Sequence, residues 1–91
     1  MTMIDVWVEV DGNGVAQALH EAGEKLDSAG GDGFLDFSAV RRIDTSGLRA
    51  LEDFAGVADE KAVKVTLRGV NVDVYKVLKL AQLSSRFSIV N

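Results

Sequence analysis

The stretch that decides the fold lies near the middle of the chain and reads Arg41-Arg42-Ile43-Asp44-Thr45-Ser46-Gly47-Leu48. It separates an apolar run typical of a buried strand from a run whose apolar residues recur at helical spacing. Asp and Thr are both favoured as helix N-caps, so we expect Asp44 or Thr45 to cap the helix that follows. The Thr45 and Ser46 hydroxyls would then lie at the positive end of the helix dipole, where a phosphate is tolerated.

Upstream of this stretch, the spacing of the apolar residues predicts a strand followed by a helix. Ile4–Val10 has apolar residues at every second position on one face, with Trp7 on the other, and residues 11–14 predict a turn. An amphipathic helix is expected next, and its apolar stripe comprises Val15, Leu19, Ala22 and Leu26. The glycine-rich residues 29–33 predict the end of this helix and a tight return of the chain.

The remaining elements continue this alternation. Phe34–Val40 is expected to form a central strand, and Asp36 within it should lie near the carboxyl end of the strand or have a hydrogen-bonding partner. The helix after the central stretch carries its apolar stripe at Leu48, Leu51, Phe54, Ala55 and Ala58. A third strand is predicted at Ala62–Leu67, a third helix after an Asn71 cap, and a last strand at Phe87–Val90.

The resulting β-α-β-α-β-α-β order predicts one α/β domain over residues 1–91, with a largely parallel or mixed central sheet built by right-handed crossovers. Functional groups of such sheets usually gather outside the carboxyl ends of the strands. We expect the connection between Val40 and Gly47 to emerge there. The central stretch is therefore placed where a binding site is most often found.

Composition excludes several classes of function. Fourteen acidic and ten basic residues give a formal net charge of -4, which argues against a nucleic-acid partner. The chain has no cysteine and one histidine, His20, which we expect on a helix surface, so no metal site, catalytic triad or cofactor loop is predicted. No apolar run is long enough for direct membrane insertion. We expect a cytoplasmic binding protein rather than an enzyme.

Four segments resemble the STAS domain of bacterial anti-sigma factor antagonists, over roughly Gly33 to the C-terminus. They are Asp36-Phe37-Ser38-Ala39-Val40, Ile43-Asp44-Thr45-Ser46-Gly47-Leu48, and Leu67-Arg68-Gly69-Val70 with Val77-Leu78-Lys79-Leu80-Ala81-Gln82-Leu83. The resemblance implies a STAS-like fold. It also implies that the hydroxyl residue after Asp44, which is Thr45, is phosphorylated by a partner serine/threonine kinase that is itself the anti-sigma factor.

On this interpretation the domain is a partner switch. The unphosphorylated form binds the kinase and frees its sigma factor, and the added charge of a phosphate breaks the docking surface. Ser46 is the second choice for the phosphorylated residue. The predicted partner-binding residues are Arg42, Asp44, Thr45, Ser46, Gly47 and Leu48.

A second interpretation follows from the Asp44-Thr45 pair, which is similar to STAS subunits that bind the ATPase of bacterial phospholipid-transport ABC complexes. In those subunits the threonine contributes to docking without phosphorylation. The family's usual N-terminal pair of strands and its C-terminal helix are not evident here. The single N-terminal strand predicts an unpaired sheet edge open to self-association, and hence a homodimer as a further expectation.

Overall fold

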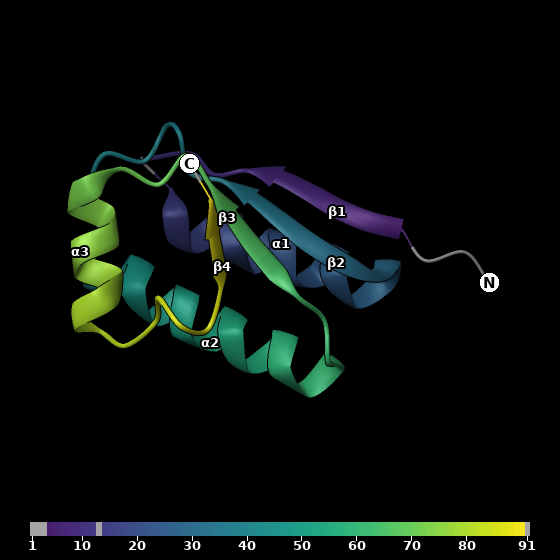
Figure 1. The fold of residues 1–91 in the computed structure, drawn as a ribbon. Coiled ribbons are helices and arrows are strands. Elements are labelled where there is room, and N and C mark those ends of the chain that lie inside the picture. The colour runs from purple at the N-terminus through teal and green to yellow at the C-terminus, as the bar shows by residue number, and fades with distance from the viewer. Residues whose placement is uncertain (1–3, 13, 91) are drawn as a thin grey trace.

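Strands and helices alternate along the chain in the computed structural model, which describes residues 4–12 and 14–90 (Figure 1). The elements are β1 (Ile4–Glu9), α1 (Val15–Ala29), β2 (Gly30–Asp36), α2 (Thr45–Lys61), β3 (Val65–Arg68), α3 (Val72–Leu80) and β4 (Ser88–Val90). The four strands form one sheet in the order β1-β2-β3-β4, and each neighbouring pair is parallel. The predicted α/β fold and element order are confirmed, and the sheet is parallel throughout.

The hydrophobic core lies between one face of the sheet and the helices. Figure 1 shows α1 behind the sheet, with α2 running beside it. The largest fully buried side chains come from strands, helices and the turn after β2, and they include Leu19, Leu26, Leu35, Phe37, Leu51, Leu67 and Leu78. This pattern fits amphipathic helices that each bury one apolar stripe on a sheet.

The opposite face of the sheet, which we call the open face, has no helix against it among the described elements (Figure 1). Trp7 on this face is 51% exposed. Its ring stacks on Phe34 with centroids 6.0 Å apart, and the Arg68 guanidinium lies 5.3 Å from the Trp7 ring centroid. An aromatic pair and a cation–π contact therefore cover part of a sheet surface that faces solvent.

The predicted bounds of the second strand are wrong. β2 begins at Gly30 instead of Phe34 and ends at Asp36, and residues 37–40 form a turn in which the Val40 N–H donates to the Phe37 carbonyl at 2.9 Å. The glycine-rich segment is a strand because it pairs with a strand on each side: Gly30 lies opposite Ile4 of β1, and Gly33 lies opposite Val65 of β3.

Two smaller expectations concern the ends of β1 and β2. The Gly14 N–H donates to the Asp11 carbonyl at 3.1 Å, as expected for a turn, although Asn13 of that turn lies outside the described residues. Asp36 is the last residue of β2, and its carboxylate accepts a hydrogen bond of 2.9 Å from the Ser38 N–H. Asp36 therefore lies at the carboxyl end of its strand and also has a hydrogen-bonding partner, which are the two alternatives that the sequence left open.

Candidate functional site

Asp44 is the residue that starts α2. Its backbone is extended, with φ of -94°, and its carboxylate accepts hydrogen bonds of 2.8 Å from the Gly47 N–H and 2.8 Å from the Ser46 hydroxyl. These two bonds, the backbone one first, hold the pKa of Asp44 below the ordinary carboxyl value. The sequence predicted either Asp44 or Thr45 as the N-cap of this helix, and in the structure the N-cap is Asp44.

The two neighbouring hydroxyls differ in what they do. The Ser46 hydroxyl donates to Asp44 and so belongs to the cap. Thr45 is exposed at the first position of α2, and its hydroxyl makes no hydrogen bond to any described residue. Thr45 is therefore the hydroxyl that an approaching molecule can bind without breaking the cap.

Gly47 and Leu48 hold this helix start against the rest of the molecule. A Cβ at buried Gly47 would lie 2.9 Å from Ile43 Cγ1 and 3.4 Å from Val15 Cγ1, so the first turn of α2 packs tightly on its own entry segment and on α1. Leu48 is partly buried against the core. Of the predicted partner-binding residues, Gly47 has an internal packing role, whereas Arg42, Asp44, Thr45 and Ser46 are exposed.

Residues 37–44, which we call the site loop, are in close contact with the chain at Gly12 and at Gly69. A Cβ at Gly12 would lie 2.5 Å from the Ala39 carbonyl oxygen, and a Cβ at Gly69 would lie 2.9 Å from Ser38 Cβ. Gly69 also has φ of +69°, which glycine adopts without strain. The turn at Gly12 was predicted from the sequence, but the contacts of Gly12 and Gly69 with the site loop were not, because each joins residues about 30 positions apart.

Asn71 provides the third restraint on the site loop. Its side-chain oxygen caps α3 by accepting from the Val74 N–H at 2.8 Å, as the sequence indicated. Its amide nitrogen meanwhile donates to the Val40 and Arg41 carbonyls, each at 3.2 Å. Sequence reasoning found the cap but missed these two bonds. One side chain thus fixes both the start of α3 and the segment that leads to Thr45.

Three arginines lie close to Thr45 along the chain. Arg41, Arg42 and Arg49 are all exposed near the start of α2. A hollow of about 410 Å³ beside it is lined by Arg42, Asp44 and Ser46, together with the turn before α1. The chain as a whole carries a net charge of -4, so this local excess of arginine is a departure from the average.

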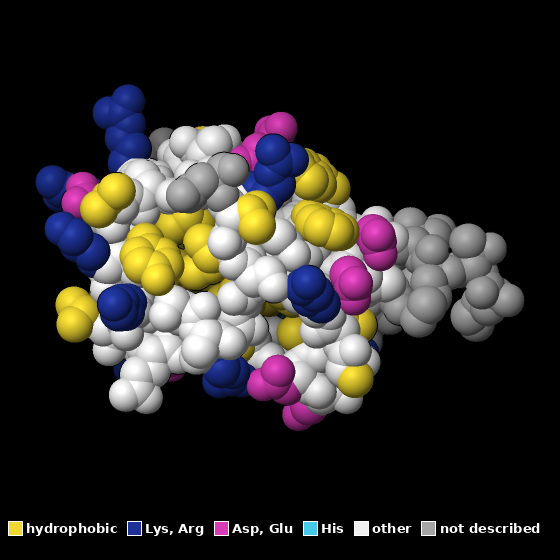
Figure 2. Space-filling view, in the orientation of Figure 1, with side chains coloured by type: hydrophobic (Ala, Val, Ile, Leu, Met, Phe, Trp, Pro, Cys, Tyr) yellow, Lys and Arg dark blue, Asp and Glu magenta, His cyan; other side chains and the backbone are white. Residues whose placement is uncertain are grey.

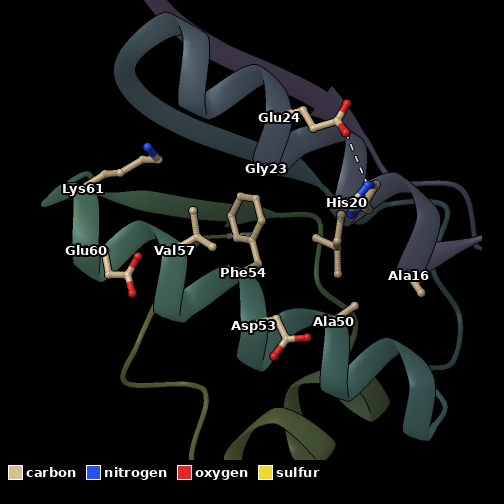
Figure 3. Close-up of a pocket in the computed structure, with 11 residues that line it drawn as sticks. Ala16, His20, Gly23, Glu24, Ala50, Asp53, Phe54, Val57, Glu60 and Lys61 are labelled. Atoms are coloured by element: carbon tan, nitrogen blue, oxygen red, sulfur yellow. Dashed lines mark ion pairs between the residues drawn. The ribbon is translucent and has the colours of Figure 1, made fainter.

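A larger hollow of about 580 Å³ lies between α1 and α2 (Figure 3). Buried Phe54 lies in it, small residues such as Ala16 and Gly23 line it, and Figure 3 shows His20 at its side pointing toward Glu24, with which it pairs at 3.3 Å. His20 is exposed on a helix surface, as predicted. We find no arrangement of a nucleophile and a base in this hollow.

The described residues contain no cluster of three or more His, Cys, Asp or Glu side chains that would suit a metal ion. Among the same residues, no helix is long and apolar enough to cross a membrane.

The fold and this helix start define the class of protein. The model of the STAS domain family matches residues 9–91, and the chain belongs to that family. It is 43% identical over 49 residues to the intermembrane phospholipid transport system binding protein MlaB of Escherichia coli strain K12, and equally to MlaB of Shigella flexneri. The matched stretch is 54% of this chain and spans half the length of each MlaB protein.

Solved structures share the fold at low sequence identity. The NMR structure of the protein TM1081 superposes with a TM-score of 0.76 at 18% identity, covering 100% of this chain and 78% of that one. A crystal structure of the same protein, a candidate anti-sigma factor antagonist from Thermotoga maritima, gives 0.67 at 18% identity, covering 98% and 75%. A sulfate transporter family protein from Wolinella succinogenes gives 0.76 at 20% identity, covering 98% and 80%.

Proposed function

We propose that this chain is a STAS subunit that docks onto the ATPase of a phospholipid-transport ABC complex through the surface around Thr45, without being phosphorylated. The observation that carries the proposal is the exposed Thr45 hydroxyl, which has no hydrogen-bond partner among the described residues at a capped helix start. The similarity to MlaB, whose name places it in an intermembrane phospholipid transport system, supports this choice of partner.

Charge indicates the kind of surface that would meet Thr45. Arg41, Arg42 and Arg49 are exposed within four residues of Thr45 along the chain, and an acidic partner surface would be both steered toward them and paired with them on contact. Asp44 keeps its negative charge beside them, and the cap bonds hold its carboxylate toward the first turn of α2. We therefore expect the ATPase to present carboxylates opposite these arginines.

The start of α3 adds an apolar part to this surface. Val72 is 68% exposed and Tyr75 is 40% exposed, and both line a hollow of about 470 Å³ together with Val70 and Ile89. Figure 2 shows apolar side chains around a hollow over this part of the molecule, at the left of the view. Because Asn71 ties α3 to the site loop, this apolar patch and Thr45 are held in a fixed relation, as a docking surface requires.

The proposal is tested by co-expressing the chain with the ATPase of such a complex and measuring the complex by size-exclusion chromatography. Wild type should co-elute with the ATPase, with or without ATP, and Thr45→Glu should not. An acidic residue at the first position of a helix is favourable to the helix, so this variant should fold normally, which circular dichroism can check.

Ser85→Glu is the matched control. Ser85 is exposed and lies beyond the carboxyl end of α3, whereas Thr45 follows the site loop, which is bonded to the start of α3. The substitution adds the same charge as Thr45→Glu. This variant should co-elute like wild type. Equal binding by Thr45→Glu and wild type would contradict the proposed surface, and failure of wild type to bind any such ATPase would contradict the proposed partner.

A second candidate function is the phosphorylation-controlled partner switch of an anti-sigma factor antagonist. The accessible Thr45 hydroxyl favours it, because a kinase needs a free hydroxyl and a helix start accommodates the phosphate that results. The phosphate would place nearly two negative charges in the docking surface and release the partner.

This second function predicts that a cognate serine/threonine kinase with ATP labels wild type and Ser46→Ala but not Thr45→Ala. Labelling that persists in Thr45→Ala would show that the phosphorylated residue is a different one. A wild-type protein that stays unlabelled while it binds the ATPase would leave the transporter subunit as the function.

A further inference from the structure

Among the strands that the structure describes, none pairs with the outer edge of β1. β1 is the first strand of the sheet order and pairs only with β2 among the described strands. Every second residue of β1 therefore directs its N–H and C=O groups away from the sheet. Such an edge can accept an added strand from another polypeptide, and the side chains beside it determine which sequence fits.

On the open face this edge carries a regular pattern of Asp5, Trp7 and Glu9. Asp5 and Glu9 are exposed, and no described residue forms an ion pair with either. The Asp5 carboxylate accepts a hydrogen bond of 3.0 Å from the Asp32 N–H of β2, and the Arg68 guanidinium lies over the Trp7 ring. Figure 2 shows this face, with apolar side chains over β1 and β2 and acidic side chains beside them.

On the helix-covered face the edge is apolar. Val6 and Val8 alternate with the acidic residues and are only partly buried against the core. A strand placed beside β1 would cover them with its own inward-facing side chains. The edge therefore presents acid, apolar, aromatic, apolar and acid in succession from Asp5 to Glu9.

A second copy of the chain fits this edge poorly. Pairing β1 with another β1 in antiparallel fashion, centred on Trp7, keeps the helices of both copies on one side of the joined sheet and sets Asp5 opposite Glu9 of the other copy. Like charges directly opposite each other destabilise a strand pair. The charge pattern thus opposes the self-association that an open edge would otherwise invite.

We propose that the β1 edge binds an extended, basic segment of a partner protein, which adds to the sheet as a fifth strand. Lys or Arg residues of that segment face Asp5 and Glu9, an apolar residue between them faces Trp7, and apolar residues on the other side cover Val6 and Val8. This site is separate from the Thr45 surface, and the inference does not depend on the proposed function.

The probe is a capped peptide with the core Lys-Val-Leu-Val-Lys, which reads the same in both strand directions. Trp7 is the only tryptophan of the chain, so its emission reports binding at this edge. We expect saturable binding that weakens with salt. The matched peptide Glu-Val-Leu-Val-Glu should bind at least about tenfold more weakly, because two opposite-charge pairs become two like-charge pairs.

Backbone methylation separates strand addition from simple charge attraction. One version of the basic peptide is N-methylated at both valines and another at the leucine and lysines, which removes the N–H groups of one side of the strand or the other. An added strand uses only one side, so one version should lose binding and the other should keep most of it. Equal binding of both versions would overturn the proposal.

Protein variants test the edge residues. Glu9→Lys should weaken binding of the basic peptide about fivefold or more and strengthen that of the acidic peptide. Glu21→Lys, an equal change of charge on the exposed face of α1, should leave the preference unchanged. An unchanged preference in Glu9→Lys would overturn the proposal. So would sedimentation of the wild type as a dimer that the basic peptide dissociates, because the edge would then belong to a second copy.

Discussion

The absence of a side chain at Gly47 allows the close packing of the helix start that carries Thr45. Gly47 and Gly56 are both in α2, but a Cβ at Gly47 would press on Ile43 and Val15, whereas a Cβ at Gly56 would meet nothing within 4 Å. Helix propensity favours alanine over glycine at both positions. The difference between the two positions is therefore one of packing alone.

We predict that Gly47→Ala destabilises the protein by about 1–3 kcal/mol, because the added methyl group overpacks the helix start. Gly56→Ala should instead stabilise it by about 0.5–1 kcal/mol. Urea unfolding followed by circular dichroism measures both. A Gly47→Ala variant as stable as Gly56→Ala would mean that the first turn of α2 can move away from Ile43 at no cost.

Asp36 and Asp44 predict a loss of stability in acid. Hydrogen bonds, from Ser38 and from Gly47 and Ser46 respectively, lower the folded-state pKa of each carboxyl below the ordinary value of 3.8. A lowered pKa stabilises the folded state fully at pH values above 3.8, and that contribution disappears as the pH falls through the lowered value.

The urea midpoint of the wild type should therefore fall between about pH 5 and pH 2. The double variant Asp36→Asn and Asp44→Asn should lose less over the same range, because asparagine also caps helices but does not titrate. If both proteins lose the same stability in acid, carboxylates elsewhere in the chain are responsible.

At the scale of elements, Asn71 couples the start of α3 to the site loop. Asn71→Ala removes both the cap and the amide bonds, and should cost about 1–2 kcal/mol of stability. Asn71→Asp keeps an acceptor for the Val74 N–H but loses the donors to Val40 and Arg41. We expect α3 to remain intact in this variant while the site loop loosens.

Amide hydrogen exchange distinguishes these effects. In Asn71→Asp the Val40 N–H, which is bonded within the site loop, should exchange faster than in wild type, while the N–H groups of α3 are unchanged. Unchanged protection of Val40 would indicate that the glycine contacts alone hold the loop.

The sequence predicted elements better than their ends. The three helices follow from apolar stripes, and Asp44 and Asn71 follow from cap preferences, because these signals are local. β2 was misplaced by four residues at each end, since Gly30–Gly33 was interpreted as a return and Phe37–Val40 as strand. Phe37 is fully buried although it lies in the turn after β2, so its apolar side chain alone does not distinguish a buried strand from a buried turn.

The site was predicted to a similar extent. Thr45 and its neighbours were found from the cap pattern and the family resemblance, and the structure places them at one helix start. The contacts of Gly12, Gly69 and Asn71 with the site loop were not predicted, because tertiary contacts between distant turns leave no periodic pattern in the sequence. The roles of the site residues remain predictions.

At the scale of the whole molecule, the sheet divides the aromatic residues between a buried and an open side. Phe37 is fully buried, and Phe34 lies half-buried on the open face. Phe37→Ala should cost about 3–5 kcal/mol, a large part of the total stability of about 5–15 kcal/mol typical of such a domain.

Phe34→Ala should cost clearly less, since its ring is already partly in water, and urea unfolding of the two variants tests the comparison. Equal losses would mean that the open face contributes as much to stability as the core. That outcome would require the stacking of Trp7 on Phe34 and the contact with Arg68 to be far stronger than such contacts usually are.

The close approach of Gly12 and Gly69 to the site loop also decides where the chain can be modified. Gly12 lies against the Ala39 carbonyl and Gly69 against the Ser38 backbone, so a residue inserted between Ser38 and Ala39 would break these contacts even though both side chains are exposed. Ser85, in the connection between α3 and β4, is also exposed, and none of the described glycines approaches it in this way. A label for immobilisation or single-molecule work belongs at Ser85.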